Sequence, residues 1–409
     1  MKTIAILGLG NRGGVYANGF AENEKVKIVA VCDPNPQSLL RGKEQYGVAP
    51  ENLFSDENEF FARKRADVLL VATMDELHYN QTIRALEMGY DVLLEKPVSP
   101  SYDECKKIAE CAHRTGRSVV VCHNLRYTPF YQKIKTLIVE GQIGDVVHVE
   151  QSENVGFGHY MCSFVRGNWH DSSKTSPIIL QKCCHDLDII NWIIGKKCEK
   201  LSSVGSLSYY NEAHANGSPQ YCVDCSRLGC PYDVRDFYIK SPESLCVPYG
   251  FDKSKENILR YVADKSHNYS RCVFRSDNDV CDRQTVNMMF EGGVTANLLM
   301  HGFANRTGRL TAVYGTKGVL SGSLESGIVT LEKFDGTSVS IDVNKEIKNA
   351  SHSGGDIKLT LDYADYIVDG KPALGISLVD DSMYSHKLAF AAEQSRLSGG
   401  AWVSPGGEL

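Results

Sequence analysis

The first 122 residues alternate short apolar runs with amphipathic stretches. The runs have the length of buried strands and cover Ile4–Leu7, Val26–Val31, Val68–Ala72, Val92–Leu94 and Val119–Val121. Between them, Asp75–Met88 and Tyr102–Arg114 repeat apolar residues at helical spacing. Strands that alternate with helices predict a parallel sheet with helices on both faces. We therefore expect a doubly wound α/β domain over residues 1–122.

The pattern changes after about residue 123. Strand-like alternation, often bounded by Gly-rich turns, predicts strands at 146–150, 285–290, 294–300, 309–314 and 328–334. Helical spacing returns at Leu180–Ile194, Lys358–Val368 and Asp380–Leu397, whereas about 202–282 is rich in Tyr, Ser and Cys and has no regular pattern. These features predict a second, α+β domain over residues 123–409, with an antiparallel sheet and a Cys-rich insertion at about 202–282.

Composition narrows the class of protein. The 409 residues are 42% hydrophobic and 23% charged, with a net charge of −6, which argues against disorder and against a general nucleic-acid binder. No apolar run approaches the 18 residues of a membrane span, so we expect no membrane partner. The fourteen cysteines are scattered along the chain, which favours reduced thiols and a cytoplasmic location over a secreted disulfide framework.

A glycine motif follows the first predicted strand. Gly8-x-Gly10-x-x-Gly13 opens a helix inside one βαβ unit, and this context is typical of a dinucleotide-binding loop. The three glycines allow a tight turn, close approach of a pyrophosphate, and helix–strand packing. Asp33 ends the next strand, where a carboxylate binds the ribose 2′-hydroxyl of NAD and repels the phosphate of NADP. The prediction is NAD, although Arg41 lies close enough in the sequence to weaken the preference.

Motifs along nearly the whole chain resemble the Gfo/Idh/MocA family of sugar and inositol oxidoreductases. The resemblance rests on Ala72-Thr73, His78, Glu95-Lys96-Pro97, Arg126-Tyr127, Ile143-Gly144, His185-x-x-Asp188-x-x-x-Trp192-x-x-Gly195, Phe290–Gly293, Gly315–Gly318 and Ala391–Ser395. It implies an N-terminal Rossmann domain that binds NAD(P), and a C-terminal domain with a large open-faced, mostly antiparallel sheet often used for oligomer contacts. A homodimer or homotetramer is therefore expected.

The resemblance also implies which residues form the site. It places Lys96 between nicotinamide and substrate, where an ammonium can stabilise developing charge on oxygen or relay a proton. The expected cofactor-binding residues are Gly8, Gly10, Asn11, Arg12, Gly13, Asp33, Thr73, His78, Glu95 and Lys96.

His185 and Asp188 share one face of a predicted helix, which suits general acid–base chemistry. Many family members carry a catalytic Asp four residues before this His, but here that position is Gln181, which cannot exchange a proton. Lys182 is the candidate replacement. For Asp188, catalysis and a merely orienting role remain open.

Polar and aromatic side chains near the predicted site are candidates for substrate binding. Asn124, Arg126 and Tyr127 follow the last Rossmann strand, where open α/β sheets bind ligands. Trp169 and His170 precede the predicted helix that carries His185, and Gln181 is the residue at the position of the usual Asp. His352 lies in a Gly-flanked polar cluster near the C-terminus. Trp169 suits stacking on a sugar ring. The alternative for each is an ordinary loop side chain.

The cysteine spacing in the insertion is unusual. Cys222-x-x-Cys225-x-x-x-x-Cys230 could hold a structural zinc if Cys246, Cys272 or His214 supplied a fourth ligand, and Cys246 is the candidate chosen. Reduced thiols without metal and a disulfide are the alternatives.

These features lead to three functional hypotheses. The first is an NAD-dependent dehydrogenase acting on a ring hydroxyl of a sugar, sugar derivative or inositol. The second is a redox-neutral enzyme that oxidises a sugar transiently, eliminates the aglycone and returns the hydride. The third is a non-catalytic NAD-dependent sensor, against which the joint presence of Lys96 and His185 speaks.

Overall fold

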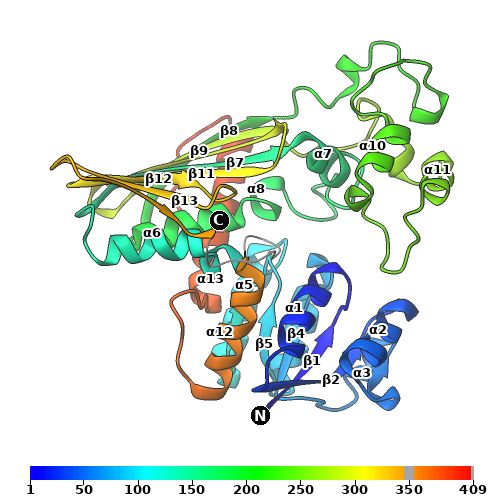
Figure 1. The fold of residues 1–409 in the computed structure, drawn as a ribbon, viewed down its shortest axis with the longest axis horizontal. Coiled ribbons are helices and arrows are strands. Elements are labelled where there is room, and N and C mark those ends of the chain that lie inside the picture. Colours follow the sequence, from blue (N-terminus) through cyan, green and yellow to red (C-terminus); the bar gives the residue numbers. More distant parts are fainter. Residues whose placement is uncertain (345–353, 407–409) are drawn as a thin grey trace.

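The computed structural model describes residues 1–344 and 354–406, which form two sheets joined by helices (Figure 1). The first sheet contains six parallel strands in the order β3-β2-β1-β4-β5-β6. This is the strand order of a dinucleotide-binding Rossmann fold, so the predicted doubly wound sheet is confirmed. Its strands are β1 (Lys2–Leu7), β2 (Val26–Cys32), β3 (Leu53–Phe54), β4 (Val68–Val71), β5 (Asp91–Leu94) and β6 (Val119–Val121).

Both faces of this sheet are covered because each central strand is apolar on both sides. In β1, Ile4 and Ile6 face one core while Ala5 and Leu7 face the other. Helices flank both faces: α1 (Asn11–Ala21), α2 (Pro36–Tyr46), α3 (Glu57–Phe60), α4 (His78–Glu87) and α5 (Tyr102–Thr115). The α12 helix (Gly355–Asp369) returns to pack on α1, where a Cβ on Gly19 would lie 2.2 Å from Thr360 Oγ1.

The second sheet has eight strands in the order β14-β13-β12-β11-β7-β10-β9-β8. Only the β7–β10 pair is parallel, so the expected mostly antiparallel sheet is confirmed. One face carries a buried core, including Val286, Met288 and Leu298, whereas Leu299 and Leu310 stay exposed. The strands are β7 (Val146–Gly156), β8 (Cys198–Ser206), β9 (Arg283–Phe290), β10 (Thr295–Ala304), β11 (Gly308–Gly315), β12 (Gly318–Ser323), β13 (Ile328–Lys333) and β14 (Ser338–Asp342).

Two expectations for the second half need correction. The helix predicted at Leu180–Ile194 is two helices, α8 (Ile178–Gln181) and α9 (Cys184–Ile194), and Lys96 Nζ donates to the Gln181 carbonyl at the break. The insertion is not wholly irregular, because it contains α10 (Val234–Lys240) and α11 (Lys255–Ala263). The remaining helices are α6 (Pro129–Val139), α7 (Phe157–Tyr160) and α13 (Val379–Leu397). Within the described residues, no helix is both long enough and apolar enough to cross a membrane.

The last helix, α13, is joined to the Rossmann half through buried histidines. His386 Nε2 accepts a hydrogen bond from the Val98 backbone N–H at 2.9 Å, and its Nδ1 donates to the Ser382 carbonyl at 2.8 Å. His123, at the end of β6, reaches the Ser382 hydroxyl at 2.8 Å. A proton added to His386 Nε2 would face the Val98 N–H donor, so the neutral imidazole fits this site and the imidazolium does not.

This arrangement predicts a loss of stability at acid pH. Burial lowers the pKa of His123 to about 4 and that of His386 to about 3, from an ordinary value of 6.5. Between pH 6.5 and 4 the unfolded chain therefore binds more protons than the native chain. The free energy of unfolding should fall by roughly 3 kcal/mol for His123 alone across that window. Urea denaturation at several pH values measures this slope, and the slope should flatten in His123→Gln and His386→Gln. An unchanged slope in both variants would contradict the prediction.

Candidate active site

The glycine loop has the geometry that a dinucleotide requires. Gly8 has φ +88°, and a Cβ there would lie 2.7 Å from the Ala72 carbonyl oxygen. A Cβ on Gly13 would lie 1.9 Å from the Gly8 carbonyl oxygen, whereas a Cβ on Gly10 would meet only open space. The N-cap of α1 makes no side-chain hydrogen bond. The loop therefore leaves space beside Gly10 and a helix N-terminus for the pyrophosphate of NAD.

The other predicted cofactor residues hold the neighbouring loops in place. Asp33 Oδ2 accepts from the Leu9 N–H at 2.7 Å, which links the end of β2 to the glycine loop. His78 Nδ1 lies 2.8 Å from the Pro97 carbonyl oxygen, and its Nε2 lies 3.3 Å from that of Thr73. Thr73 donates its hydroxyl to Gln81. These contacts hold the loops after β4 and β5 in place. They are contacts within the protein, and a direct contact of Thr73 or His78 with the cofactor therefore stays a prediction.

Gly10 offers a sharp test of the loop. Gly10→Ala adds a methyl group in open space, and Gly10 has φ −74°, so the variant should unfold at the wild-type temperature. The same methyl group would occupy the space of the pyrophosphate, so NADH should bind about tenfold more weakly or worse. Fluorescence titration with NADH measures the affinity. Gly13→Ala is the contrasting variant, because its methyl group collides with backbone and should lower the unfolding temperature. Unchanged NADH affinity in Gly10→Ala would contradict the assignment.

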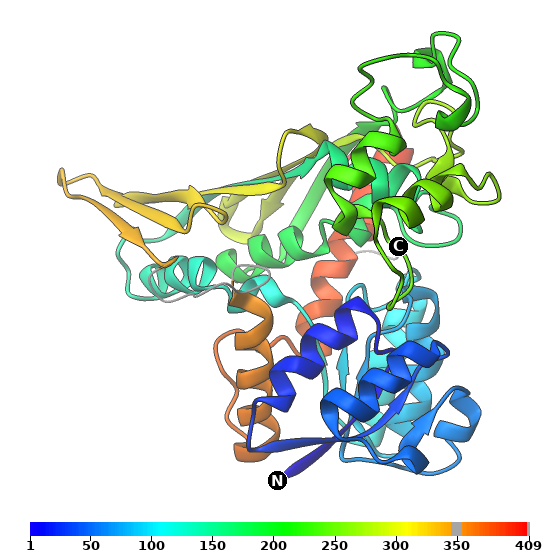
Figure 2. The same ribbon diagram turned by 45° about the vertical axis from the view of Figure 1, so that its right-hand side comes forward.

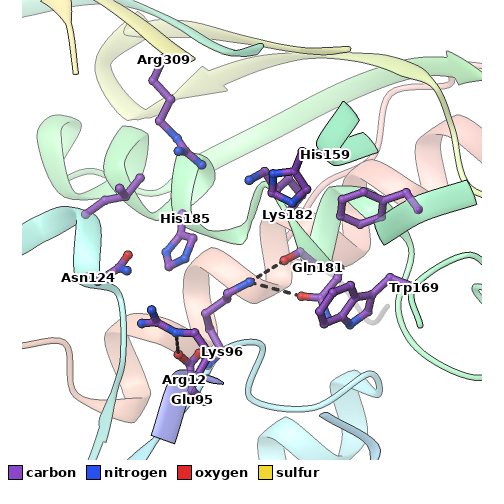
Figure 3. A pocket seen from close by; sticks show the side chains of 12 residues that line it. Arg12, Glu95, Lys96, Asn124, His159, Trp169, Gln181, Lys182, His185 and Arg309 are labelled. Carbon is purple, nitrogen blue, oxygen red and sulfur yellow. Dashed lines mark hydrogen bonds and ion pairs between the residues drawn. The ribbon is translucent and has the colours of Figure 1, made fainter. Parts of the chain in front are cut away.

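A pocket opens between the Rossmann strand ends and the second sheet (Figure 3). Most of its lining side chains are polar or charged, and several are basic. They come from the first turn of α1, from the segments after β5 and β6, from α7 and the π-helical turn at Met161–Val165, from the loop before α8, from the end of α8, from α9 and from β11. The lining residues are Arg12, Glu95, Lys96, Asn124, Leu125, His159, Phe164, Trp169, Gln181, Lys182, His185 and Arg309.

Lys96 extends into this pocket from the segment after β5. Its ammonium donates to the Gln181 carbonyl at 2.8 Å and contacts Gln181 Oε1 at 3.3 Å. The Lys96–Pro97 peptide bond is cis. Thus Gln181, at the position of the usual Asp, holds the lysine with neutral oxygen atoms.

Arg12 joins three segments beneath the pocket. Its guanidinium donates to Glu95 Oε1 at 2.6 Å and to Asp356 Oδ1 at 2.8 Å, and it contacts the Tyr16 hydroxyl. Burial would raise the pKa of Glu95, but the nearby charges of Arg12 and Lys96 outweigh burial and lower it. Asp356 also accepts from Asn124 Nδ2 at 3.0 Å. Arg12 therefore fastens α1 to β5 and α12, and its predicted role toward the cofactor stays a prediction.

His185 reaches the pocket from the first turn of α9, whereas Asp188 lies beneath it. Asp188 is fully buried and accepts two hydrogen bonds from Arg126, each 2.6 Å. Burial alone would raise its pKa, but the Arg126 charge lowers it. The His123 ring stands edge-on to His185, with centroids 5.8 Å apart, and His123 Nε2 lies 3.8 Å from Asp188. These contacts favour the orienting role for Asp188 over direct proton transfer. They also engage the Nε and Nη2 atoms of Arg126, which is not among the pocket-lining residues.

Lys182 lines the pocket beside a buried ion pair, Glu153 with Arg309, that the sequence reasoning missed. Its ammonium lies 3.6 Å from Glu153 Oε1, and Glu153 also contacts Arg309. Burial lowers the pKa of Lys182 and raises that of Glu153, so both shifts favour the neutral forms. Arg309 donates to Asp186 at 2.8 and 3.2 Å. In the sequence, Glu153 and Arg309 could have been noticed only as charged residues at strand positions whose side chains face the core.

Two of the remaining substrate-binding predictions fall outside the pocket. Tyr127 is buried in the core between α12 and the Rossmann sheet, and His170 lies beside Asn268 and the Gly167 carbonyl. Neither is among the pocket-lining residues, because packing and local hydrogen bonds engage both side chains. His352 lies outside the described residues. Trp169, Asn124 and Gln181 do line the pocket.

The cysteines of the insertion do not gather into a metal site. Cys222 is buried against Arg166 and the Arg271 carbonyl, whereas Cys246 contacts the Ser244 carbonyl. No group of three or more potential ligands occurs in residues 1–344 and 354–406. The structural zinc proposed for Cys222, Cys225, Cys230 and Cys246 is therefore not supported. All fourteen cysteines, each within the described ranges, are free thiols.

Relatives share parts of the sequence. YteT of Bacillus subtilis, whose name gives the oxidoreductase class without a substrate, is 26% identical over 338 residues, or 78% of this chain and 76% of that protein. A 2,7-anhydro-N-acetylneuraminate hydratase of Mediterraneibacter gnavus is 28% identical over 52% of this chain and 54% of its own length. Inositol 2-dehydrogenase of Salmonella typhimurium is 24% identical over 47% of this chain and 54% of its own length. This chain thus spans about half the length of the last two.

The fold is also shared with solved structures. Scyllo-inositol dehydrogenase from Lactobacillus casei, with bound NAD(H) and scyllo-inositol, superimposes with a TM-score of 0.68 at 18% identity over all of both chains. Two sequence models of one oxidoreductase family match this chain. The NAD-binding Rossmann model covers residues 2–123, and the C-terminal alpha/beta model covers residues 135–404. The match covers both halves and agrees with the two sheets and the glycine loop described above, so the chain belongs to the GFO_IDH_MocA oxidoreductase family.

Proposed function

We propose that this chain transfers a hydride between NAD and a ring hydroxyl of a sugar, sugar derivative or inositol. The proposal rests on the convergence of Lys96, His185 and Lys182 on one pocket beyond the carboxyl ends of β5 and β6 (Figure 3). Ligands of open α/β sheets bind at that edge. When bound, NAD would accept or supply the hydride at its nicotinamide ring. The names of the inositol dehydrogenase relatives support the same substrate class.

The residues divide the proton chemistry between them. An alcohol whose carbon gives up a hydride must also release its hydroxyl proton. Two imidazoles line the pocket, those of His159 and His185, and the proton is assigned to His185 because its ring adjoins that of the buried His123. Lys96 lines the same pocket, so its ammonium can stabilise negative charge on that oxygen. A buried network lies beneath His185 and supports its ring through the contact with His123. The network consists of Asp188, Arg126 and His123.

Two buried polar atoms of the lining fit a hydroxylated ligand. Trp169 Nε1 is a donor and Asn124 Oδ1 is an acceptor, and neither has a hydrogen-bond partner among the described residues. A buried polar group without a partner is costly. Hydroxyl groups of a polyol can satisfy both atoms, because each hydroxyl donates and accepts.

A redox-neutral cleavage is the second candidate, favoured by the Lys182–Glu153 pair. Elimination from a keto sugar needs a base for the acidified C–H and an acid for the leaving oxygen, in addition to the group that handles the hydroxyl proton. Lys182, with its lowered pKa, offers a second proton-transfer group beside His185. The hydratase relative from Mediterraneibacter gnavus adds weight to this candidate.

The experiment is absorbance at the NADH band with purified protein, NAD and pooled monosaccharides, uronic acids, inositols and glycosides. A steady rise supports the dehydrogenase, and the pool can then be divided to find the substrate. A flat trace with released aglycone supports redox-neutral cleavage. Tight NAD binding with neither result would overturn both reactions in favour of a sensor.

A further inference from the structure

The insertion sends one segment across to the Rossmann half of the molecule. Residues 246–253, called the strap below, lie between the short helical turn at Pro242–Ser244 and α11, both within the insertion. In Figures 1 and 2 they form the green loop that descends toward α2. The strap thus links an element of the second domain to the helix that follows the predicted ribose-binding carboxylate.

Three contacts seat the tip of the strap on α2. Asn35 Nδ2 donates to the Tyr249 carbonyl at 3.0 Å. The Arg41 guanidinium carbon lies 4.9 Å from the centroid of the Tyr249 ring, within range for a cation–π interaction. Gly250 has φ +87°, and a Cβ there would lie 2.9 Å from Gln37 Cγ. The close approach at Gly250 therefore requires glycine, both for its backbone conformation and for space.

The same part of α2 adjoins the adenosine end of the cofactor site. The Asn35 N–H donates to Asp33 Oδ1 at 2.8 Å, and Asp33 Oδ2 accepts from the Leu9 N–H at 2.7 Å. Arg41 also reaches the Gly14 carbonyl oxygen, 3.4 Å away in the first turns of α1. The strap consequently rests on Asn35, which is bonded to Asp33, and Asp33 in turn joins the end of β2 to the glycine loop.

We infer that the strap closes over the adenosine half of bound NAD and slows its release. This inference rests on the proposed use of NAD. A Rossmann dinucleotide lies along the carboxyl edge of the sheet, with its adenosine ribose at the end of β2. A segment anchored on Asn35, Gln37 and Arg41 borders that end of the site, so the strap would narrow the path by which the adenosine half leaves. Slow release would suit the redox-neutral candidate best, because there NAD is reduced and reoxidised without leaving the protein.

The test is the rate of NADH dissociation, measured by stopped-flow displacement with excess NAD. Tyr249→Ala removes the ring from Arg41, and Gly250→Ala pushes the strap away from Gln37. Each should release NADH about tenfold faster than the wild type. Asn35→Ser keeps a side chain that caps α2 but removes the amide donor, and it should shift the rate in the same direction. Leu228→Ala, on a 95% exposed residue of the same insertion, is the matched control and should leave the rate unchanged.

The possible results distinguish a failure of the strap inference from a failure of the proposed use of NAD. A merely structural strap would lower the unfolding temperature of the variants and leave the NADH dissociation rate within twofold of the wild type, which would overturn the inference. Absence of NADH binding by the wild-type chain would overturn the cofactor assignment as well. Faster release at an unchanged unfolding temperature supports the strap.

Discussion

Replacing Lys96 with methionine is expected to lower kcat about a thousandfold while NADH still binds. Methionine keeps much of the side-chain length, but it removes the ammonium that contacts Gln181 and lines the pocket. Loss of one preorganised donor to developing oxygen charge costs about 10²- to 10³-fold in kcat, and loss of a proton relay adds to it. The measurement is steady-state turnover on the substrate found by the pooled assay, together with an NADH titration.

Lys240→Met is the matched control, because its side chain is 76% exposed on α10. Its kcat and NADH affinity should equal those of the wild type. A Lys96→Met variant that keeps a third or more of the wild-type kcat would refute the role of Lys96 in the chemistry. If NADH binding were lost together with turnover, Lys96 would act in cofactor binding instead.

Asp188→Asn is expected to destabilise the protein by about 3–5 kcal/mol. The substitution keeps the volume of the side chain but leaves the Arg126 charge buried without its carboxylate partner. Breaking one half of a buried ion pair costs this much because an uncompensated charge remains in a medium of low dielectric. Urea denaturation of the full chain measures the free energy of unfolding.

The double variant Arg126→Met/Asp188→Leu is the control. Removing both charges avoids the unpaired ion, so much of the lost stability should return. If Asp188→Asn were as stable as the wild type but inactive, the orienting role favoured here would be wrong and Asp188 would belong to the chemistry.

Much of the fold was predictable because local patterns carry it. The apolar runs of the first half match β1, β2, β4, β5 and β6 to within a few residues, since buried parallel strands are apolar on both faces. The strands β3, β8, β12 and β14 were missed. The clearest reason applies to β3 and β14, which are two and five residues long: a run of that length carries at most two apolar positions, too few to establish a strand period.

The site was predictable only where a motif fixes the backbone. The spacing of Gly8, Gly10 and Gly13 predicted a dinucleotide loop because it follows a strand and opens a helix, and the structure shows a tight turn at Gly8 and open space at Gly10. Lys96 and His185, chosen through the resemblance, line the pocket, and their roles there stay a prediction. By contrast, Glu153 and Arg309 lie on strands 156 residues apart in the sequence, and no local pattern joins them.

The sequence by itself thus determined the Rossmann half, its glycine loop and the presence of a second mostly antiparallel sheet, because periodicity and turn chemistry act over a few residues. Tertiary structure decided which side chains meet. It paired Arg126 with Asp188 beneath His185, set Lys182 beside Glu153, dispersed the cysteines of the insertion and seated Tyr249 on Arg41. The physical reason is that desolvation and charge pairing depend on groups brought together from distant segments, and no single segment records the neighbours it will meet.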